Sequence, residues 1–141
     1  MPTLESATDE FRQILASASD KLAHASRTTG RWSREQILGH LIDSASNNHQ
    51  RFVRAQLEDE VALPGYTQAE WVEAQHYQDR DWKELIALWA AYNRHLLHLM
   101  EVFPQEKRSN RVRIGGGDPL TIELVMVDYV RHLKHHLDQI L

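Results

Sequence analysis

The sequence contains no cysteine and few residues that break helices, with six glycines and four prolines among its 141 residues. Without cysteine the chain cannot form disulfides, use a thiolate nucleophile or build a metal site from thiolates. The scarcity of glycine and proline, together with 42% hydrophobic residues, indicates a folded helical protein rather than a disordered one. No run of about 18 apolar residues is present, so we expect no membrane-spanning helix.

The charge of the chain is mildly acidic, because 16 lysines and arginines face 20 aspartates and glutamates, a net charge of −4. Domains dedicated to nucleic acids carry a basic excess, so no nucleic-acid partner is expected. Charged residues at positions 5, 9, 10 and 12 interrupt the first twenty residues and exclude the apolar core of a signal peptide. We therefore expect one soluble, cytoplasmic domain over residues 1–141, long enough to bury a core without cross-links.

Apolar residues recur at three- and four-residue intervals, a pattern that predicts helices. The first helix covers about residues 4–22. The second follows Ser33, which with Gln36 predicts a capping box, and runs to about residue 57. The third follows Asp81 and stops near residues 103–104, because proline cannot continue a helix. The last is predicted to begin at Asp118 and Pro119, as N-cap and first helical residue, and to reach the C-terminus.

The segments between these helices predict turns, a short helix and a long loop. Residues 58–66 read as a turn, and Thr67 with Glu70 predicts a capping box that opens a short helix through Trp71. Residues 104–118 form an irregular loop in which only residues 111–114 resemble a strand. The fold class is therefore all-α: a four-helix bundle with a short extra helix and a long loop before the last helix. An up-down-down-up and an up-down-up-down topology both remain open.

Nine histidines stand out in the composition, and two of them share one face of the last helix. At about 100° per residue, His132 and His136 fall at or inside the edge of the apolar arc, whereas His135 falls on the polar side. Imidazoles at positions i and i+4 can hold one metal ion between them. The alternative is a pair that faces solvent or fills a seam of the bundle.

A polar stripe borders the apolar face of the second helix. It contains His40, Ser44, Asn47 and Arg51, which lie on one side of the helix at about 100° per residue. Such a stripe is either a solvated flank or the lining of an internal pocket. Taken alone, His40 reads as a boundary histidine that is hydrogen-bonded to a neighbour.

Two segments together resemble the DinB-like superfamily of four-helix-bundle metalloenzymes, which includes bacillithiol- and mycothiol-dependent S-transferases and isomerases. They are residues 32–52, with Trp-Ser, then Ile-Leu-Gly-His-Leu-Ile-Asp-Ser, and residues 129–140, with His-Leu-Lys-His-His-Leu-Asp-Gln. The resemblance covers about residues 31–141. It implies a metal triad of His40, His132 and His136, with His135 outside it. Three imidazoles suit a divalent metal ion such as zinc, nickel or iron.

The resemblance implies an enzyme, because three protein ligands leave open positions on the metal. The expected activity on a small-molecule substrate is hydrolysis or thiol transfer, and a thiol would come from an external low-molecular-weight compound because the chain has no cysteine. The alternative is a non-catalytic, stress-associated binding bundle with a structural or vestigial metal site. Candidates for supporting the metal ligands or binding substrate are Asp43, Asn47, Arg51, Asp128, Tyr129 and Gln139.

Two further expectations concern surfaces. A homodimer through an outer helix face is plausible, with Trp71, Trp82 and Trp89 as the candidates for exposed contacts. Four basic residues also lie within the long loop before the last helix. They form either a solvated segment or, beside a metal pocket, a lid that recruits a carboxylate or phosphate; these residues are Lys107, Arg108, Arg111 and Arg113.

Overall fold

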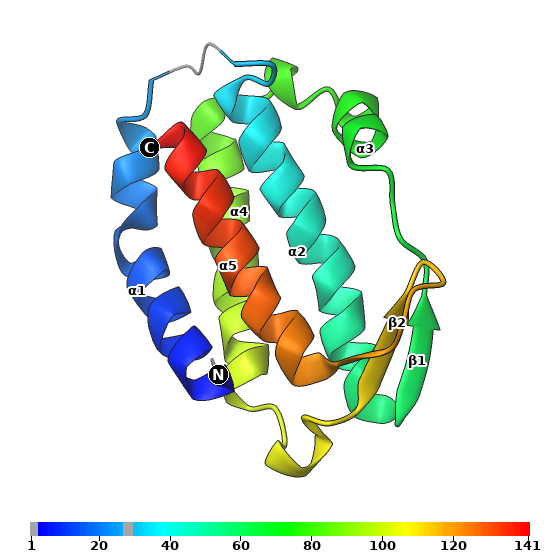
Figure 1. Cartoon of the computed structure of the whole chain (residues 1–141). Coiled ribbons are helices and arrows are strands. Elements are labelled where there is room, and N and C mark those ends of the chain that lie inside the picture. Colours follow the sequence, from blue (N-terminus) through cyan, green and yellow to red (C-terminus); the bar gives the residue numbers. More distant parts are fainter. Residues whose placement is uncertain (1–2, 27–29) are drawn as a thin grey trace.

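The computed structural model of the protein describes residues 3–26 and 30–141 and shows four long helices packed side by side (Figure 1). In Figure 1 the first and last of these helices run upward and the other two run downward, so the topology is up-down-down-up. The predicted four-helix bundle is confirmed. No helix in the described part of the chain has both the length and the apolar character needed to cross a membrane. The bundle consists of α1 (Leu4–Ala23), α2 (Arg34–Leu57), α4 (Trp82–Glu101) and α5 (Ile122–Ile140).

The boundaries of α2 and α4 follow the predicted capping residues. The Ser33 hydroxyl accepts a hydrogen bond from the Gln36 amide at 3.2 Å, and the Gln36 side chain accepts one from the Ser33 amide at 2.8 Å. This reciprocal capping box satisfies two donors at the start of α2. Asp81 caps α4 by accepting from the Glu84 amide at 3.1 Å. These caps set the position of His40 at the second turn of α2.

The two long connections pair with each other in a small sheet. Strands β1 (Glu60–Leu63), β2 (Arg111–Ile114) and β3 (Leu120–Thr121) lie in the order β1-β2-β3, with β1 parallel to β2 and β2 antiparallel to β3. The strand at residues 111–114 is confirmed, whereas the plain turn expected at residues 58–66 contains β1. The two facing valines, Val61 and Val112, are buried and anchor the sheet on the bundle.

The predicted start of the last helix was wrong. Helix α5 begins at Ile122, and Thr121 is its N-cap, accepting from the Leu124 amide at 3.3 Å. Asp118 lies instead in the connection between β2 and β3. Gly115 and Gly116 have φ angles of 58° and 78°, which only glycine adopts without strain, and they turn the chain back toward β2.

The short extra helix is present as α3 (Gln68–Gln75), followed by the 3₁₀ turn η1 (Tyr77–Asp79). It extends one turn beyond the predicted end at Trp71. Thr67 makes no side-chain capping hydrogen bond, so the capping box predicted there was wrong. This part of the chain packs on α2 through Tyr77, whose ring lies directly over the backbone of Gly39.

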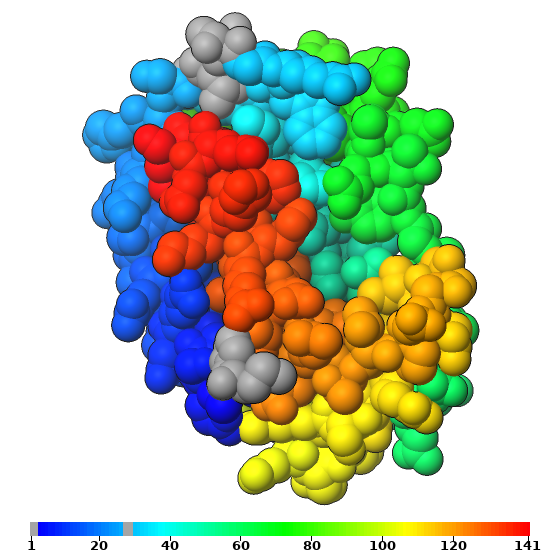
Figure 2. Space-filling model, viewed as in Figure 1, coloured from blue at the N-terminus to red at the C-terminus, as the bar shows by residue number. Residues whose placement is uncertain are grey.

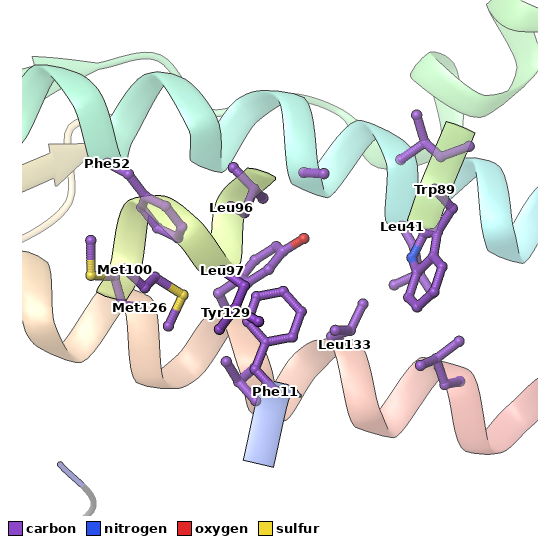
Figure 3. Close-up of a cluster of buried hydrophobic side chains, with 14 of the residues drawn as sticks. Phe11, Leu41, Phe52, Trp89, Leu96, Leu97, Met100, Met126, Tyr129 and Leu133 are labelled. Carbon is purple, nitrogen blue, oxygen red and sulfur yellow. The ribbon is translucent and has the colours of Figure 1, made fainter. Parts of the chain in front are cut away.

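Large apolar and aromatic side chains fill the space between the four helices (Figure 3). The Tyr129 ring packs against Phe11 and Phe52, with ring centroids 6.0 and 5.8 Å apart. Trp89 is completely buried, and Trp82 is buried with its Nε1–H donating to the Leu22 carbonyl at 2.9 Å. The expectation that these two tryptophans form an exposed contact face was therefore wrong; only Trp71 of the three is exposed.

The basic residues of the long loop hold the fold together instead of forming a free patch. Arg108 lies 2.6 Å from a Glu5 carboxylate oxygen and 3.6 Å from one of Glu123, which ties the loop to both α1 and α5. The Lys107 ammonium donates to the Gln56 carbonyl at 3.0 Å, at the end of α2. The remaining two also have partners: Arg111 pairs with Glu60, and Arg113 donates to the Gly117 carbonyl.

Candidate metal centre

Helices α2 and α5 bring together the three histidines singled out in the sequence. His40 comes from α2, and His132 and His136 come from successive turns of α5. One ring nitrogen of each lies within 4.8 Å of the others, and the Nε2 atoms of His132 and His136 are 3.0 Å apart. The His40 ring meets both partners edge-on, with centroid distances of 5.5 and 4.8 Å. Within residues 3–26 and 30–141, this is the one group of three or more histidine, aspartate or glutamate side chains close enough together to share a metal ion.

Burial favours the neutral form of two of these imidazoles, His40 and His132. His40 is 0% exposed and lies beside the Trp32 ring. Burial lowers the pKa of His40 to about 4, and the nearby rings of His136 and His132 lower it further by charge repulsion. Burial also lowers the pKa of His132, with contributions from His136 and His135. Since a metal ion binds the neutral imidazole, both histidines are in the binding form at neutral pH.

The ring nitrogens of His40 test whether a metal ion fits. Both are buried, and neither has a hydrogen-bond partner among the described residues. A buried polar atom left unpaired costs roughly 1–3 kcal/mol, so such atoms usually serve a function. Two zinc–nitrogen bonds span at most about 4.2 Å. The separation of up to 4.8 Å is slightly wider than this span, so the rings would have to move closer together to hold a shared divalent ion, for which three imidazoles are a suitable donor set.

Gln139 orients one of the candidate ligands. The Nδ1 atom of His136 lies 3.0 Å from Gln139 Oε1. An amide oxygen only accepts hydrogen bonds, so Nδ1 carries the proton and the lone pair of Nε2 faces the cluster. Histidines that bind metals usually donate their second ring nitrogen in this way, which fixes the ring and its tautomer.

Asp43, also predicted to support the ligands, serves the packing of α3 and η1 on α2, whereas Asn47, predicted to do the same, forms a hydrogen bond within α2. The Asp43 carboxylate accepts from the Tyr77 hydroxyl and from the Gln75 amide, both at 2.7 Å. Burial raises the pKa of Asp43, and these two hydrogen bonds oppose the rise. Asn47 donates to the Asp43 carbonyl at 2.9 Å. The structure thus gives both residues partners other than the three histidines.

Tyr129 and Asp128 lie one turn before His132 and differ in their surroundings. Tyr129 is buried, and its hydroxyl donates to the side-chain oxygen of Asn93 in the core. Burial raises its pKa, so the phenol stays protonated. Asp128 is exposed and lies 3.7 Å from Arg131. Of the two, Asp128 has the side chain that is exposed to solvent.

A pocket of about 390 Å³ opens beside His132. Figure 2 shows this hollow between α5, the start of α3 and the β2–β3 connection, with α2 at its floor. The polar stripe of α2 therefore lines a pocket, at least at Ser44 and Arg51. Sequence reasoning missed Tyr66 and Asn48, because Tyr66 comes from a segment read as a plain turn. The lining residues are Ser44, Asn48, Arg51, Gly65, Tyr66, Gln68, Ile114, Leu120, Val125, Asp128, Tyr129 and His132.

The lowered pKa of His40 predicts how stability depends on pH in the metal-free protein. Unfolded His40 takes up a proton below about pH 6.5, whereas the folded protein resists protonation until about pH 4. The stability that comes from this difference is complete above pH 6.5 and is lost as the pH falls toward 4. We expect urea unfolding with chelator present to show a slope of up to about 1.4 kcal/mol per pH unit from His40. A His40→Phe variant should have a shallower slope; equal slopes would contradict the assignment.

Comparison with known proteins gives the same fold. YfiT from Bacillus subtilis (strain 168), which is named as a candidate metal-dependent hydrolase, is 24% identical over 138 residues, covering 97% of this chain and 78% of YfiT. Its solved structure, described as having an unusual four-helix-bundle topology, superposes with a TM-score of 0.72 at 22% identity, covering 97% of this chain and 79% of that chain. The crystal structure of the mycothiol-dependent maleylpyruvate isomerase superposes with a TM-score of 0.79 at 14% identity. This chain is covered to 99% but spans only 61% of the isomerase.

The family assignment rests on nearly the whole chain. At these identities the two solved structures show the shared bundle fold. The match to the family extends over residues 3–140, which include all four bundle helices and the three clustered histidines. This protein belongs to the DinB superfamily.

Proposed function

We propose that this protein is a metal-dependent enzyme that hydrolyses a small molecule, with one divalent ion held by His40, His132 and His136. The observation that carries the proposal is the convergence of three imidazoles from two helices, one of which, His132, lines a pocket. The similarity to YfiT, named as a candidate metal-dependent hydrolase, supports the same class of reaction. Zinc, nickel and iron are the candidate ions, because imidazole ligands suit all three.

In this proposal the histidines hold the metal ion, and the residues of the adjacent pocket bind the substrate. A divalent ion with three protein ligands, when bound, lowers the pKa of a water or thiol and polarises a carbonyl. Buried His40 and the Trp32 ring beside it close the centre on the α2 side. His132 is the one member of the triad that also lines the pocket, so a bound molecule reaches the centre there. Asp128, on the same wall one turn earlier, is a carboxylate that can accept a proton from attacking water.

Elemental analysis and turnover of the purified protein test this proposal together. We expect about one metal ion per chain and hydrolysis of members of a panel of chromogenic esters, amides and phosphoesters. Chelation should abolish turnover, and adding back the metal should restore it. His132→Ala should lose both the metal and the turnover, because it removes a ligand that faces the pocket. Protein without metal, or turnover that survives chelation, would contradict the proposal.

An assay with an added thiol distinguishes hydrolysis from thiol transfer. Thiol transfer is the activity class suggested by the fold shared with the mycothiol-dependent isomerase. The chain has no cysteine, so a reacting thiol must be supplied from solution. If the protein is a hydrolase, we expect the same rate of turnover with and without an added low-molecular-weight thiol. A rate that requires the thiol, with a thioether or thioester product, would replace hydrolysis by transfer while keeping the same metal centre.

A further inference from the structure

The pocket beside His132 contains an arginine without an acidic partner. Arg51 lies on α2, is half-buried and lines the pocket. We propose that the pocket takes small molecules carrying a carboxylate, which Arg51 binds, with the rest of the molecule extending toward His132. This names the substrate class of the proposed enzyme and rests on that proposal for its reaction, although the binding step itself needs no metal.

The inference is supported by the lack of an acidic partner for the Arg51 guanidinium among the described residues. Within residues 3–26 and 30–141 no carboxylate forms an ion pair with Arg51, whose hydrogen-bond partner is Asn48 Oδ1 at 3.4 Å. Two other half-buried arginines have acidic partners, since Arg34 pairs with Glu35 and Arg108 pairs with Glu5, and half-buried Arg113 lies outside the pocket and donates to the Gly117 carbonyl. A charge removed from water without a counter-ion is costly. A bound anion would therefore be stabilised by Arg51, and a carboxylate matches its planar fork with two parallel hydrogen bonds.

Neutral donors lie in the same pocket as this cation. Ser44, Tyr66 and Gln68 contribute hydroxyl and amide groups to the lining, whereas the Asn48 amide already donates to the Ser44 carbonyl at 2.8 Å. Burial raises the pKa of the Tyr66 phenol, and the charge of Arg51 only partly opposes this, so the phenol remains a protonated donor. An oxyanion bound at Arg51 thus has hydroxyl and amide donors around it, in addition to the guanidinium.

The charge of the lining favours a carboxylate over a phosphate. Arg51 is the one lysine or arginine among the pocket-lining residues, and Asp128 contributes a negative charge. A phosphate monoester carries a charge of about −1.5 to −2 at pH 7, which exceeds the single positive charge of Arg51. A carboxylate carries a single charge that Arg51 does balance.

The position of Arg51 also separates the anion from the histidine cluster. Arg51 lies eleven residues after His40 on α2, which corresponds to roughly 16 Å along the helix axis. Its guanidinium turns back toward Asn48, in the direction of His40, and the pocket continues to His132. The carboxylate therefore serves as an anchor several bonds away from the reacting group.

Binding of butyrate to the metal-free protein tests the inference without relying on activity. Butyramide is its neutral counterpart, and inorganic phosphate is the competing anion; amide chemical shifts in NMR titrations report affinity and location. We expect butyrate to shift residues around Ser44 and Tyr66 and to bind at least about tenfold more tightly than butyramide, as hydrogen bonds to charged groups predict. Arg51→Gln should remove this difference. Arg54→Gln, a change of an exposed arginine on the same helix, should preserve it.

The outcomes distinguish this inference from the proposed function. Butyrate binding that is equal in Arg51→Gln and the native protein, or absent from the native protein, would overturn it. Phosphate binding more tightly than butyrate would overturn the preference for a carboxylate. Metal content of Arg51→Gln should equal that of the native protein. If the native protein holds no metal yet binds butyrate through Arg51, the proposed function fails and the anion site stands.

Discussion

Replacing His136 with alanine is expected to remove the metal from the purified protein, whereas replacing the adjacent His135 should leave it bound. The two side chains differ in where they point, because His136 faces His40 and His132 while His135 is exposed on α5. Structural zinc sites with four protein ligands bind the ion with a free energy of about 10–16 kcal/mol. One ligand therefore contributes roughly 3 kcal/mol, which corresponds to at least a hundredfold in affinity. Competition with a fluorescent zinc chelator measures this loss.

The same loss should appear in thermal unfolding. Metal at about 1,000 times its dissociation constant stabilises a native state by about 4 kcal/mol, which raises the midpoint by roughly 10 °C for a chain of this size. Native protein and His135→Ala should show this shift on adding zinc, and His136→Ala and His40→Phe should not. Phenylalanine at position 40 retains the buried ring, which separates loss of the ligand from loss of packing. A full shift in His136→Ala would contradict the triad.

Replacing Gly39 with alanine is expected to destabilise the protein by about 3 kcal/mol, at the upper end of the cost of overpacking. A Cβ atom at this position would lie 2.1 Å from Cδ2 of Tyr77, so the tyrosine ring must move. The Tyr77 hydroxyl would then leave Asp43, which is buried and whose second carboxylate oxygen already has no partner among the described residues. Chemical denaturation followed by circular dichroism measures the loss.

A double-mutant cycle identifies the cause. In a Tyr77→Ala background the clash is absent, so Gly39→Ala should no longer destabilise the protein and should stabilise it by up to about 1 kcal/mol, because alanine is favoured over glycine inside a helix. Metal affinity of the single variant, measured on the folded fraction, tests whether the adjacent His40 moves with this part of α2. An equal cost of Gly39→Ala in both backgrounds would show that the Tyr77 contact does not explain the requirement for glycine.

The helical part of the fold could be predicted because its signals are local and repeat many times. The boundaries of α2 follow from Ser33 and Gln36, two side chains three residues apart that bond to each other's backbone. The shared face of His132 and His136 followed from the same periodicity, since residues four apart lie on one side of a helix. The resemblance to the family then selected His40 from several histidines on the second and third helices.

The parts of the structure that were predicted wrongly depend on contacts between residues far apart in the sequence. Strand β1 has four residues and pairs with a strand fifty residues later, so no periodic pattern marks it. The last helix starts at Thr121 instead of Asp118 because Leu120 and Thr121 pair with β2, a contact that outweighs the local preference of Pro119 for a helix start. The burial of Trp89 could have been predicted from its position on the apolar face of the third helix.

The pairing of β1 with β2 has a consequence for how substrate preference can change over evolution. The three clustered histidines and Arg51 come from the long helices, while Tyr66, Ile114 and Leu120 enter the pocket from the two connections that the sheet joins. These connections also meet at Gly65 and Gly115, where a Cβ on Gly115 would lie 3.5 Å from the Gly65 nitrogen. The sequences of residues 58–67 and 108–121 should therefore change together among members of the superfamily. Exchanging both together between superfamily members offers a way to transplant selectivity while the histidine cluster stays unchanged.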